Sequence, residues 1–301
     1  MQFGMPTLIE NRTLEDNIRL CRKLGLQFLE LNMNFPEYQI HELESIDRFY
    51  QAADEAGLYY TIHLDENCNI ADFNMLVADA YLETIRRTIE AAKRLIPLRD
   101  KYGYPLRDGQ GKPLQDGQGI PSWAGQGVES QPLVLNMHMH HGIYITLPDR
   151  KVQMYDRDFD TYMESFTRFR SLCEEWIGDS DIIITIENTD GFRSYEKNAI
   201  EYLLGSDKFG LTWDIGHSKA AGEMDVPFIM EHSGRLRHFH IHDGIAESSG
   251  QEGRNHLALG DGEINIQEKL SIAEERNARC VLETKTITAL EKSVEYLKEL
   301  Y

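Results

Sequence analysis

Strand-like and helix-like segments alternate along the whole chain of 301 residues. Eight short apolar segments, rich in β-branched and aromatic residues, favour strands; they cover residues 1–5, 27–32, 58–64, 132–140, 182–188, 209–216, 236–243 and 278–284. Eight amphipathic stretches favour helices; they cover residues 14–24, 43–56, 72–96, 158–177, 196–204, 222–234, 265–276 and 286–299. This alternation predicts parallel strands covered by helices, and eight repeats favour a closed (β/α)8 TIM barrel.

A doubly wound open sheet is the structural alternative, because it also alternates strands and helices. Its nucleotide-binding form carries a glycine-rich phosphate loop at the first strand-to-helix turn. The corresponding stretch here, "PTLIENRT" at residues 6–13, contains no glycine. We therefore predict an α/β protein with one TIM-barrel domain over residues 1–301. Asp72, Asp158 and Asn265 stand where the N-caps of three helices are expected.

One segment, residues 98–131, does not fit the alternation. It contains "DGQG" at 108–111 and 116–119 and "AGQG" at 124–127, with prolines between them. Such composition is typical of a long loop. Because the segment follows the third helix and precedes the fourth strand, we predict that it is inserted on the N-terminal face of the barrel.

Composition limits the classes of function. The hydrophobic content of 41% and charged content of 27% are those of a soluble globular protein. There is no apolar run of membrane length and no signal-peptide pattern at the start. Four widely spaced cysteines do not indicate a disulfide framework. We expect a cytoplasmic protein without a membrane partner, and the net charge of −19 argues against nucleic acid.

Potential catalytic and metal-ligating residues recur at the ends of the predicted strands. They are Glu30, His63, His138, His140, Glu187, Asp214, His217, His240 and Glu283. The C-terminal ends of the strands in a TIM barrel share one rim, and active sites are built there. Any one of these residues has an ordinary structural explanation, but their repetition at the same end of successive strands predicts a site.

Converging carboxylates would repel one another unless a cation lay among them. Glu187, Asp214, His240 and Glu283 come from four consecutive strands and would offer three oxygens and one imidazole nitrogen. This donor set suits a divalent Mn, Co, Mg or Zn ion and leaves coordination positions for a substrate. We predict that these four residues bind one metal ion.

The stretch "RHFHIHDG" at residues 237–244 contains three alternating histidines. In a strand their side chains would share one face. His240 lies at the predicted rim and is the expected ligand. His238 lies one layer deeper, where a structural role is expected, and the role of His242 stays open.

Four motifs resemble the xylose isomerase-like barrels, a superfamily that includes sugar isomerases, ketose 3-epimerases, inosose dehydratases and endonuclease IV. They are "TWDIGHS" at 212–218, "HIHDG" at 240–244, "HLALGDGEIN" at 256–265 and "LET" at 282–284. The resemblance implies metal ligation by Glu187, Asp214, His240 and Glu283. It also implies acid–base catalysis by Glu187 and Glu283, and contact of His217 with substrate oxygens. An Arg that follows the metal-binding His in several epimerases is absent, since Ala246 stands near that position.

The resemblance to endonuclease IV implies further metal ligands. A second ion would use His63, His140 and Glu187. The third zinc ion of that family needs an Asp two residues before a His, but Arg254 precedes His256 here. A complete three-zinc site is therefore not expected, and His63, His140 and His256 are candidates for a second metal ion or for substrate contact.

Together these observations predict a divalent-metal-dependent sugar or polyol isomerase or epimerase. Its two glutamates would transfer protons through a metal-stabilised enediolate of a small carbohydrate substrate, and a homo-oligomer is possible. The alternatives are an endonuclease IV-like zinc phosphodiesterase and an inosose dehydratase-like lyase.

Overall fold

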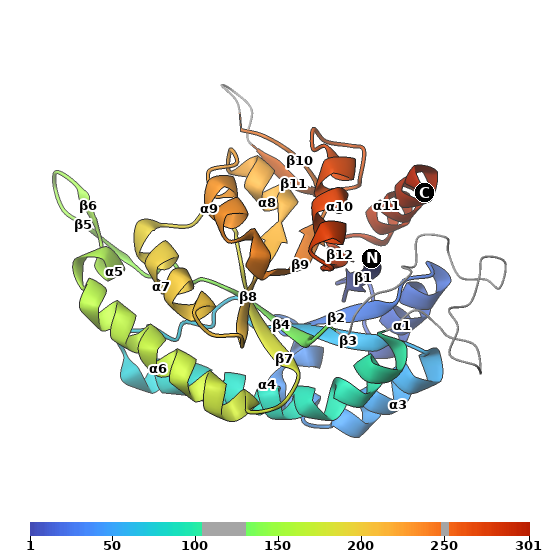
Figure 1. The fold of residues 1–301 in the computed structure, drawn as a ribbon, viewed down its shortest axis with the longest axis horizontal. Helices are drawn as coiled ribbons and strands as arrows, with labels where there is room; N and C mark the ends of the chain where they lie inside the picture. The colour runs from blue at the N-terminus through green and yellow to red at the C-terminus, as the bar shows by residue number, and fades with distance from the viewer. Residues whose placement is uncertain (104–130, 248–252) are drawn as a thin grey trace.

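The computed structural model describes residues 1–103, 131–247 and 253–301 and shows a closed barrel (Figure 1). Its eight parallel strands follow the order β1-β12-β9-β8-β7-β4-β3-β2. They are β1 (Gln2–Pro6), β2 (Phe28–Asn32), β3 (Tyr59–His63), β4 (Leu133–His138), β7 (Ile182–Glu187), β8 (Phe209–Asp214), β9 (Leu236–Ile241) and β12 (Arg279–Leu282). The structure confirms the predicted (β/α)8 TIM barrel.

Helices connect successive strands around the barrel. The longer ones are α1 (Leu14–Lys23), α3 (Ile46–Ala56), α4 (Met75–Tyr102), α6 (Phe159–Ile177), α7 (Ser194–Leu204), α10 (Ile266–Glu275) and α11 (Ile287–Leu300). Of the helix predicted over 222–234, the structure shows the short α9 (Val226–Glu231), and a further short helix, α8 (Ile215–Ala220), directly follows β8. No helix in the described parts of the chain is long and apolar enough to cross a membrane.

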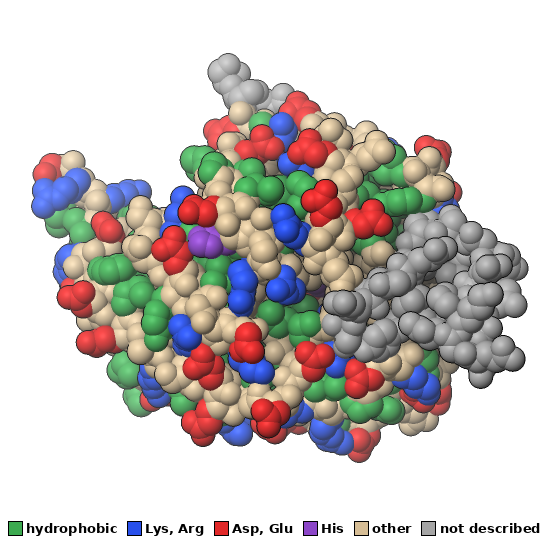
Figure 2. All heavy atoms as spheres, viewed as in Figure 1, with side chains coloured by type: hydrophobic (Ala, Val, Ile, Leu, Met, Phe, Trp, Pro, Cys, Tyr) green, Lys and Arg blue, Asp and Glu red, His purple; other side chains and the backbone are tan. Residues whose placement is uncertain are grey.

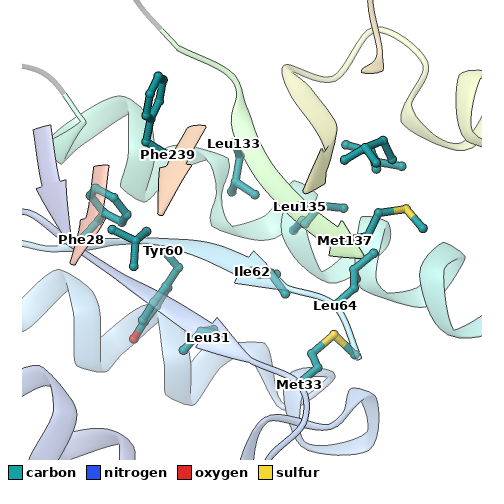
Figure 3. Packing of buried hydrophobic residues seen from close by; sticks show 14 of the residues in the cluster. Phe28, Leu31, Met33, Tyr60, Ile62, Leu64, Leu133, Leu135, Met137 and Phe239 are labelled. Atoms are coloured by element: carbon teal, nitrogen blue, oxygen red, sulfur yellow. The ribbon is translucent and has the colours of Figure 1, made fainter. Parts of the chain in front are cut away.

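The alternation of side chains along the strands separates the core from the site. In β4, Leu133, Leu135 and Met137 are buried in the hydrophobic core, and Figure 3 shows them together with apolar residues of β2, β3 and β9. The intervening Asn136 instead bonds to Glu187 of β7, inside the barrel. Successive residues of a strand point to opposite faces, so one strand contributes side chains both to the hydrophobic core and to the interior of the barrel.

The N-cap residues of the helices agree in part with those predicted from the sequence. Asn265 caps α10 by accepting a hydrogen bond from the Glu268 N–H at 3.2 Å, as predicted. Asp158 is the N-cap residue of α6 but its side chain makes no capping bond. Asn74 caps α4 in place of Asp72, because the helix begins only at Met75.

The predicted insertion over 98–131 lies largely outside the described residues, which omit 104–130. Its predicted start is wrong, since α4 continues through Pro97 to Tyr102. On its two sides, the Gln2 side chain donates to the Gly103 carbonyl at 2.7 Å, and Arg279 donates to the Gln131 carbonyl at 2.9 Å. Gln2 and Arg279 begin β1 and β12, so Gly103 and Gln131 lie at the N-terminal end of the barrel.

Two small hairpin sheets extend the rim, and neither is predicted from the sequence. β5 (Tyr144–Thr146) and β6 (Lys151–Gln153) pair antiparallel in the connection after β4, before the short helix α5 (Met154–Arg157). β10 (Asp243–Ile245) and β11 (Arg254–Leu257) pair antiparallel after β9. Figure 1 shows the β5–β6 hairpin projecting away from the body of the barrel.

Candidate metal centre

The four predicted metal ligands converge around the ring of His240. Its Nδ1 atom lies 2.9 Å from Glu187 Oε1, 3.2 Å from Glu283 Oε2 and 3.9 Å from Asp214 Oδ2. One ligand atom of each residue lies within 4.8 Å of those of the other three, and all four residues are buried. The barrel therefore gathers the predicted ligands in one cluster. That they bind a metal ion stays a prediction.

The electrostatics of this cluster fit a cation. Burial alone would raise the pKa of Glu187, but the charges of His240 and His138 hold it well below its usual value. Burial alone would lower the pKa of His240, but Glu187 and Glu283 hold it well above its usual value. Without a metal ion, a proton on His240 thus supplies positive charge that the carboxylates require.

A second observation also indicates that this cluster suits a cation. Glu283 Oε2 is buried and makes an ion-pair contact with His240 Nδ1 at 3.2 Å, but it accepts no well-aligned hydrogen bond from the described residues. A buried carboxylate oxygen without a donor is costly, and metal coordination is one way to satisfy it. Three carboxylates and one imidazole match the preferences of Mn²⁺, Co²⁺, Mg²⁺ and Zn²⁺. The residues present therefore suit the divalent ion that the sequence predicts.

Glu30 of β2 supports His240 from the opposite side of the barrel. Its Oε1 lies 2.9 Å from His240 Nε2, and its Oε2 accepts from His238 Nε2 at 2.8 Å and from the Thr61 hydroxyl at 2.9 Å. Strands β1 and β12 separate β2 from β9, so these bonds cross the barrel interior. A carboxylate behind an imidazole fixes the ring and its protonation, which leaves Nδ1 facing the cluster.

A layer of hydroxyl and amide groups lies beside Glu187. The Thr212 hydroxyl donates to the Thr185 hydroxyl at 2.7 Å, and Thr185 donates to Asn136 Oδ1 at 3.2 Å. The Asn136 amide in turn donates to Glu187 Oε2. The four residues come from β8, β7 and β4 and are buried. This layer orients the carboxylate of Glu187.

Two histidines extend the cluster on the side of β3 and β4. His63 Nε2 and His138 Nε2 lie 3.4 and 3.1 Å from Glu187 Oε2. His138 takes the place that the sequence assigned to His140. β4 ends at His138, and the chain then turns toward the hairpin, where His140 Nδ1 accepts from the Gly142 N–H at 3.0 Å. His140 belongs to none of the clusters that suit a metal ion among the described residues.

Asp214 is held by its own loop. Its Oδ1 accepts from the His217 N–H at 2.6 Å and caps α8, and its Oδ2 lies 3.0 Å from His242 Nε2. A Cβ atom on Gly216 would lie 2.0 Å from the His242 ring, so only glycine permits this approach. His242, whose role the sequence left open, thus positions a predicted ligand.

A second imidazole group, formed by His217, His242 and His256, borders the centre. The His256 N–H donates to His242 Nδ1 at 2.7 Å, and His256 Nδ1 lies 3.0 Å from the Glu283 carbonyl. Burial lowers the pKa of His256 to about 4, so this ring is neutral at pH 7. The side chain of His217 is 24% exposed and can be reached from solvent. These rings suit contact with substrate hydroxyls.

Lys285 is a cation at the site that the sequence analysis missed. Its Nζ lies 2.7 Å from Glu283 Oε1, and its side chain is 48% exposed. Burial of its inner part would lower the pKa of Lys285, but the Glu283 carboxylate raises it. The sequence feature that could have identified Lys285 is its position two residues after a predicted ligand, just past the end of β12. This amine adds positive charge beside the three carboxylates.

The sequence pattern described as "Xylose isomerase-like TIM barrel" matches residues 133–300, which is more than half of the chain. The chain belongs to the xylose isomerase-like TIM barrel family. The matched range holds Glu187, Asp214, His240 and Glu283, whereas Glu30 and His63 come from the preceding part of the barrel. A comparison with curated protein sequences gave no significant match.

Solved structures of other xylose isomerase-like barrels share the fold over nearly the full chain. A D-tagatose 3-epimerase-like protein is 21% identical, with a TM-score of 0.67 and coverage of 99% of this chain and 96% of that one. A 3-keto-D-glucoside 4-epimerase from E. coli is 13% identical, with a TM-score of 0.63 and full coverage of both chains. A xylose isomerase domain protein from Planctomyces limnophilus is 12% identical, with a TM-score of 0.64 and coverage of 100% and 95%. At these identities the likeness concerns the fold.

Proposed function

We propose that the protein is a divalent-metal-dependent isomerase or epimerase of a sugar or polyol. The observation that carries the proposal is the buried convergence of Glu187, Asp214, His240 and Glu283, in which one Glu283 oxygen accepts no well-aligned hydrogen bond from the described residues. Of two structures with the same fold, one is named as a D-tagatose 3-epimerase-like protein and the other as a 3-keto-D-glucoside 4-epimerase, which supports the substrate class. A bound divalent cation would polarise a substrate carbonyl and make the neighbouring C–H group more acidic.

Glu187 and Glu283 are the proposed proton-transfer groups. They come from β7 and the end of β12, with β8 and β9 between them, and so approach the centre from different sides. One carboxylate would remove a proton from the carbon beside the carbonyl, and the other would return a proton on the opposite face of the enediolate. The pair must then share one proton at the start of turnover.

The imidazoles around the centre would orient the substrate. His256 is neutral at pH 7 and its Nδ1 is directed to a backbone carbonyl, which leaves Nε2 to accept a hydrogen bond from a hydroxyl. His217 lies at the edge of the site and would contact a second substrate oxygen. Lys285 would hold Glu283 in place and balance part of the local negative charge.

The test uses purified protein, a panel of free and phosphorylated ketoses, and D₂O as solvent. The wild type should convert at least one ketose and place deuterium on the carbon beside the carbonyl. Glu187→Gln keeps the shape but loses proton transfer, so its kcat should fall by at least about 10²-fold. The exposed Glu231→Gln variant is the control and should retain activity. Turnover without solvent deuterium would indicate hydride transfer and contradict this mechanism.

A zinc phosphodiesterase is the second candidate, because two further groups flank the centre. His63, His138 and Glu187 form one, and His217, His242 and His256 form the other. Cleavage of abasic DNA together with two or three Zn ions per chain would favour this activity over the isomerase. Dehydration of a cyclic polyol would favour the third candidate, an inosose dehydratase-like lyase.

A further inference from the structure

His242 bonds to two parts of the site at once. Its Nε2 atom lies 3.0 Å from the carboxylate of Asp214, the predicted metal ligand at the end of β8. Its Nδ1 atom accepts a hydrogen bond of 2.7 Å from the N–H group of His256 in β11. The His242 ring is fully buried, and histidine makes up very little of the face shown in Figure 2. One buried imidazole therefore joins a predicted metal ligand to a proposed substrate contact.

These bonds determine where the proton of the His242 ring lies. The N–H group of His256 can only donate, so Nδ1 of His242 must accept and carries no proton. The proton then lies on Nε2, which donates to the Asp214 carboxylate. The Asp243 carbonyl lies 3.2 Å from Nδ1, but the His256 N–H is closer and occupies the Nδ1 lone pair. The ring is therefore the Nε2–H tautomer.

The backbone of His256 has an uncommon conformation. Its φ angle is +54°, in the left-handed region that residues other than glycine seldom adopt. β11 pairs with β10 at Arg254 and at Leu257, and the register shifts between these two pairs. The bonds of His256 to His242 and to the Glu283 carbonyl hold this conformation. Such strain persists where the surrounding structure imposes it, and it recurs at functional sites.

We propose that His242 is a positioning residue that links the metal centre to His256. Its Nε2–H bond would orient the carboxylate of Asp214 toward the cation. Its Nδ1 bond would keep the His256 backbone in the conformation that leaves the His256 Nε2 to a substrate hydroxyl. The first part rests on the predicted metal centre, and the second rests on the proposed function.

Two substitutions separate these bonds, because Asn and Gln each replace one ring nitrogen. His242→Asn places an amide oxygen near the position of Nδ1, so it can accept from His256 but does not reach Asp214. His242→Gln places an amide nitrogen near the position of Nε2, so it can donate to Asp214 but does not accept from His256. The same two substitutions of His41 are matched controls, since that side chain is 68% exposed and belongs to no candidate metal cluster among the described residues.

Three measurements test the proposal in variants that circular dichroism shows to be folded. Proton–nitrogen correlation NMR on isotope-labelled histidines should show Nδ1 of His242 without a proton, and needs neither metal nor substrate. In calorimetric titration with Mn²⁺, His242→Asn should lose about 10- to 100-fold in affinity, whereas His242→Gln should stay within about threefold of the wild type. At saturating Mn²⁺, His242→Gln should raise KM for the converted ketose by about 10-fold with a smaller change in kcat, and His242→Asn should not.

Opposite effects of the two His242 variants, with unchanged His41 variants, support the proposal. A proton on Nδ1 in the NMR spectra would overturn it, whatever reaction the protein catalyses. Equal losses of Mn²⁺ affinity in the Asn and Gln variants would also overturn it, because the ring would then act only through packing. If no ketose is converted while the NMR and Mn²⁺ results hold, the link to Asp214 is supported and the proposed reaction is contradicted.

Discussion

Addition of a divalent ion should stabilise the protein through the Glu187–Asp214–His240–Glu283 cluster. A ligand present at 100 times its Kd stabilises the folded state by about 2.7 kcal/mol. Unfolding entropy of about 2.1 cal/mol/K per residue gives roughly 0.6 kcal/mol/K for a chain of 301 residues. The expected increase in melting temperature is therefore about 4 °C over protein dialysed against EDTA, measured by differential scanning fluorimetry or calorimetry with Mn²⁺, Co²⁺, Mg²⁺ or Zn²⁺.

The variant Glu283→Gln distinguishes metal binding in this cluster from metal binding to acidic groups on the surface. Loss of the Glu283 carboxylate, a predicted direct ligand, should weaken metal affinity by at least about 100-fold, beyond the usual effect of a supporting residue. The same metal concentration would then stabilise the variant by only about 0.4 kcal/mol, a shift below about 1 °C. Glu231→Gln removes one exposed charge and should keep the full shift. Equal shifts in both variants, or no shift with any of the four ions, would refute the reasoning.

Two further predictions concern groups beside the centre. Glu30→Gln weakens the support of His240 Nε2 and should reduce metal affinity by about 10- to 100-fold in calorimetric titration, with the fold retained; unchanged affinity would show that Glu30 has only a packing role. Burial alone would lower the pKa of His141, but its hydrogen bonds to Asp190 and Glu196 raise it to about 9 from 6.5. Because the folded-state pKa is the higher one, this stabilisation is complete below pH 6.5 and is lost as the pH rises to about 9. Denaturant unfolding should show a loss of about 1–3 kcal/mol over this range in the wild type and a smaller loss in His141→Gln, and parallel curves would contradict the assignment.

The sequence predicts the barrel because two different hydrophobic periods alternate without interruption. Strands such as Ile182–Glu187 are buried throughout, and their continuous apolar runs are recognisable. The same alternation places Glu187, Asp214 and His240 at one rim, because parallel strands end on one side. The four-residue cluster could therefore be predicted before the structure was known.

Other features depend on where strands stop and how they are staggered. His138 and His140 have the same parity, so only the end of β4 decides which of them faces Glu187. The contact of Glu30 with His238 and His240 joins residues more than 200 positions apart across the barrel. The registers of the three strand pairings between β2 and β9 determine it, and no local pattern in the sequence reports those registers. The hairpin strands of three residues are likewise too short for a periodic signal.

The hydrogen-bonded layer of Thr212, Thr185 and Asn136 limits how this barrel can change. Each of these side chains bonds to the next, and the series ends on Glu187. Replacing any one by an apolar residue would leave a buried partner unsatisfied, at about 1–3 kcal/mol. These positions can change only through paired replacements, whereas exposed helix positions such as Glu231 tolerate single ones. A library designed for a new substrate should therefore randomise the connections after the strands and keep the interior of the barrel constant.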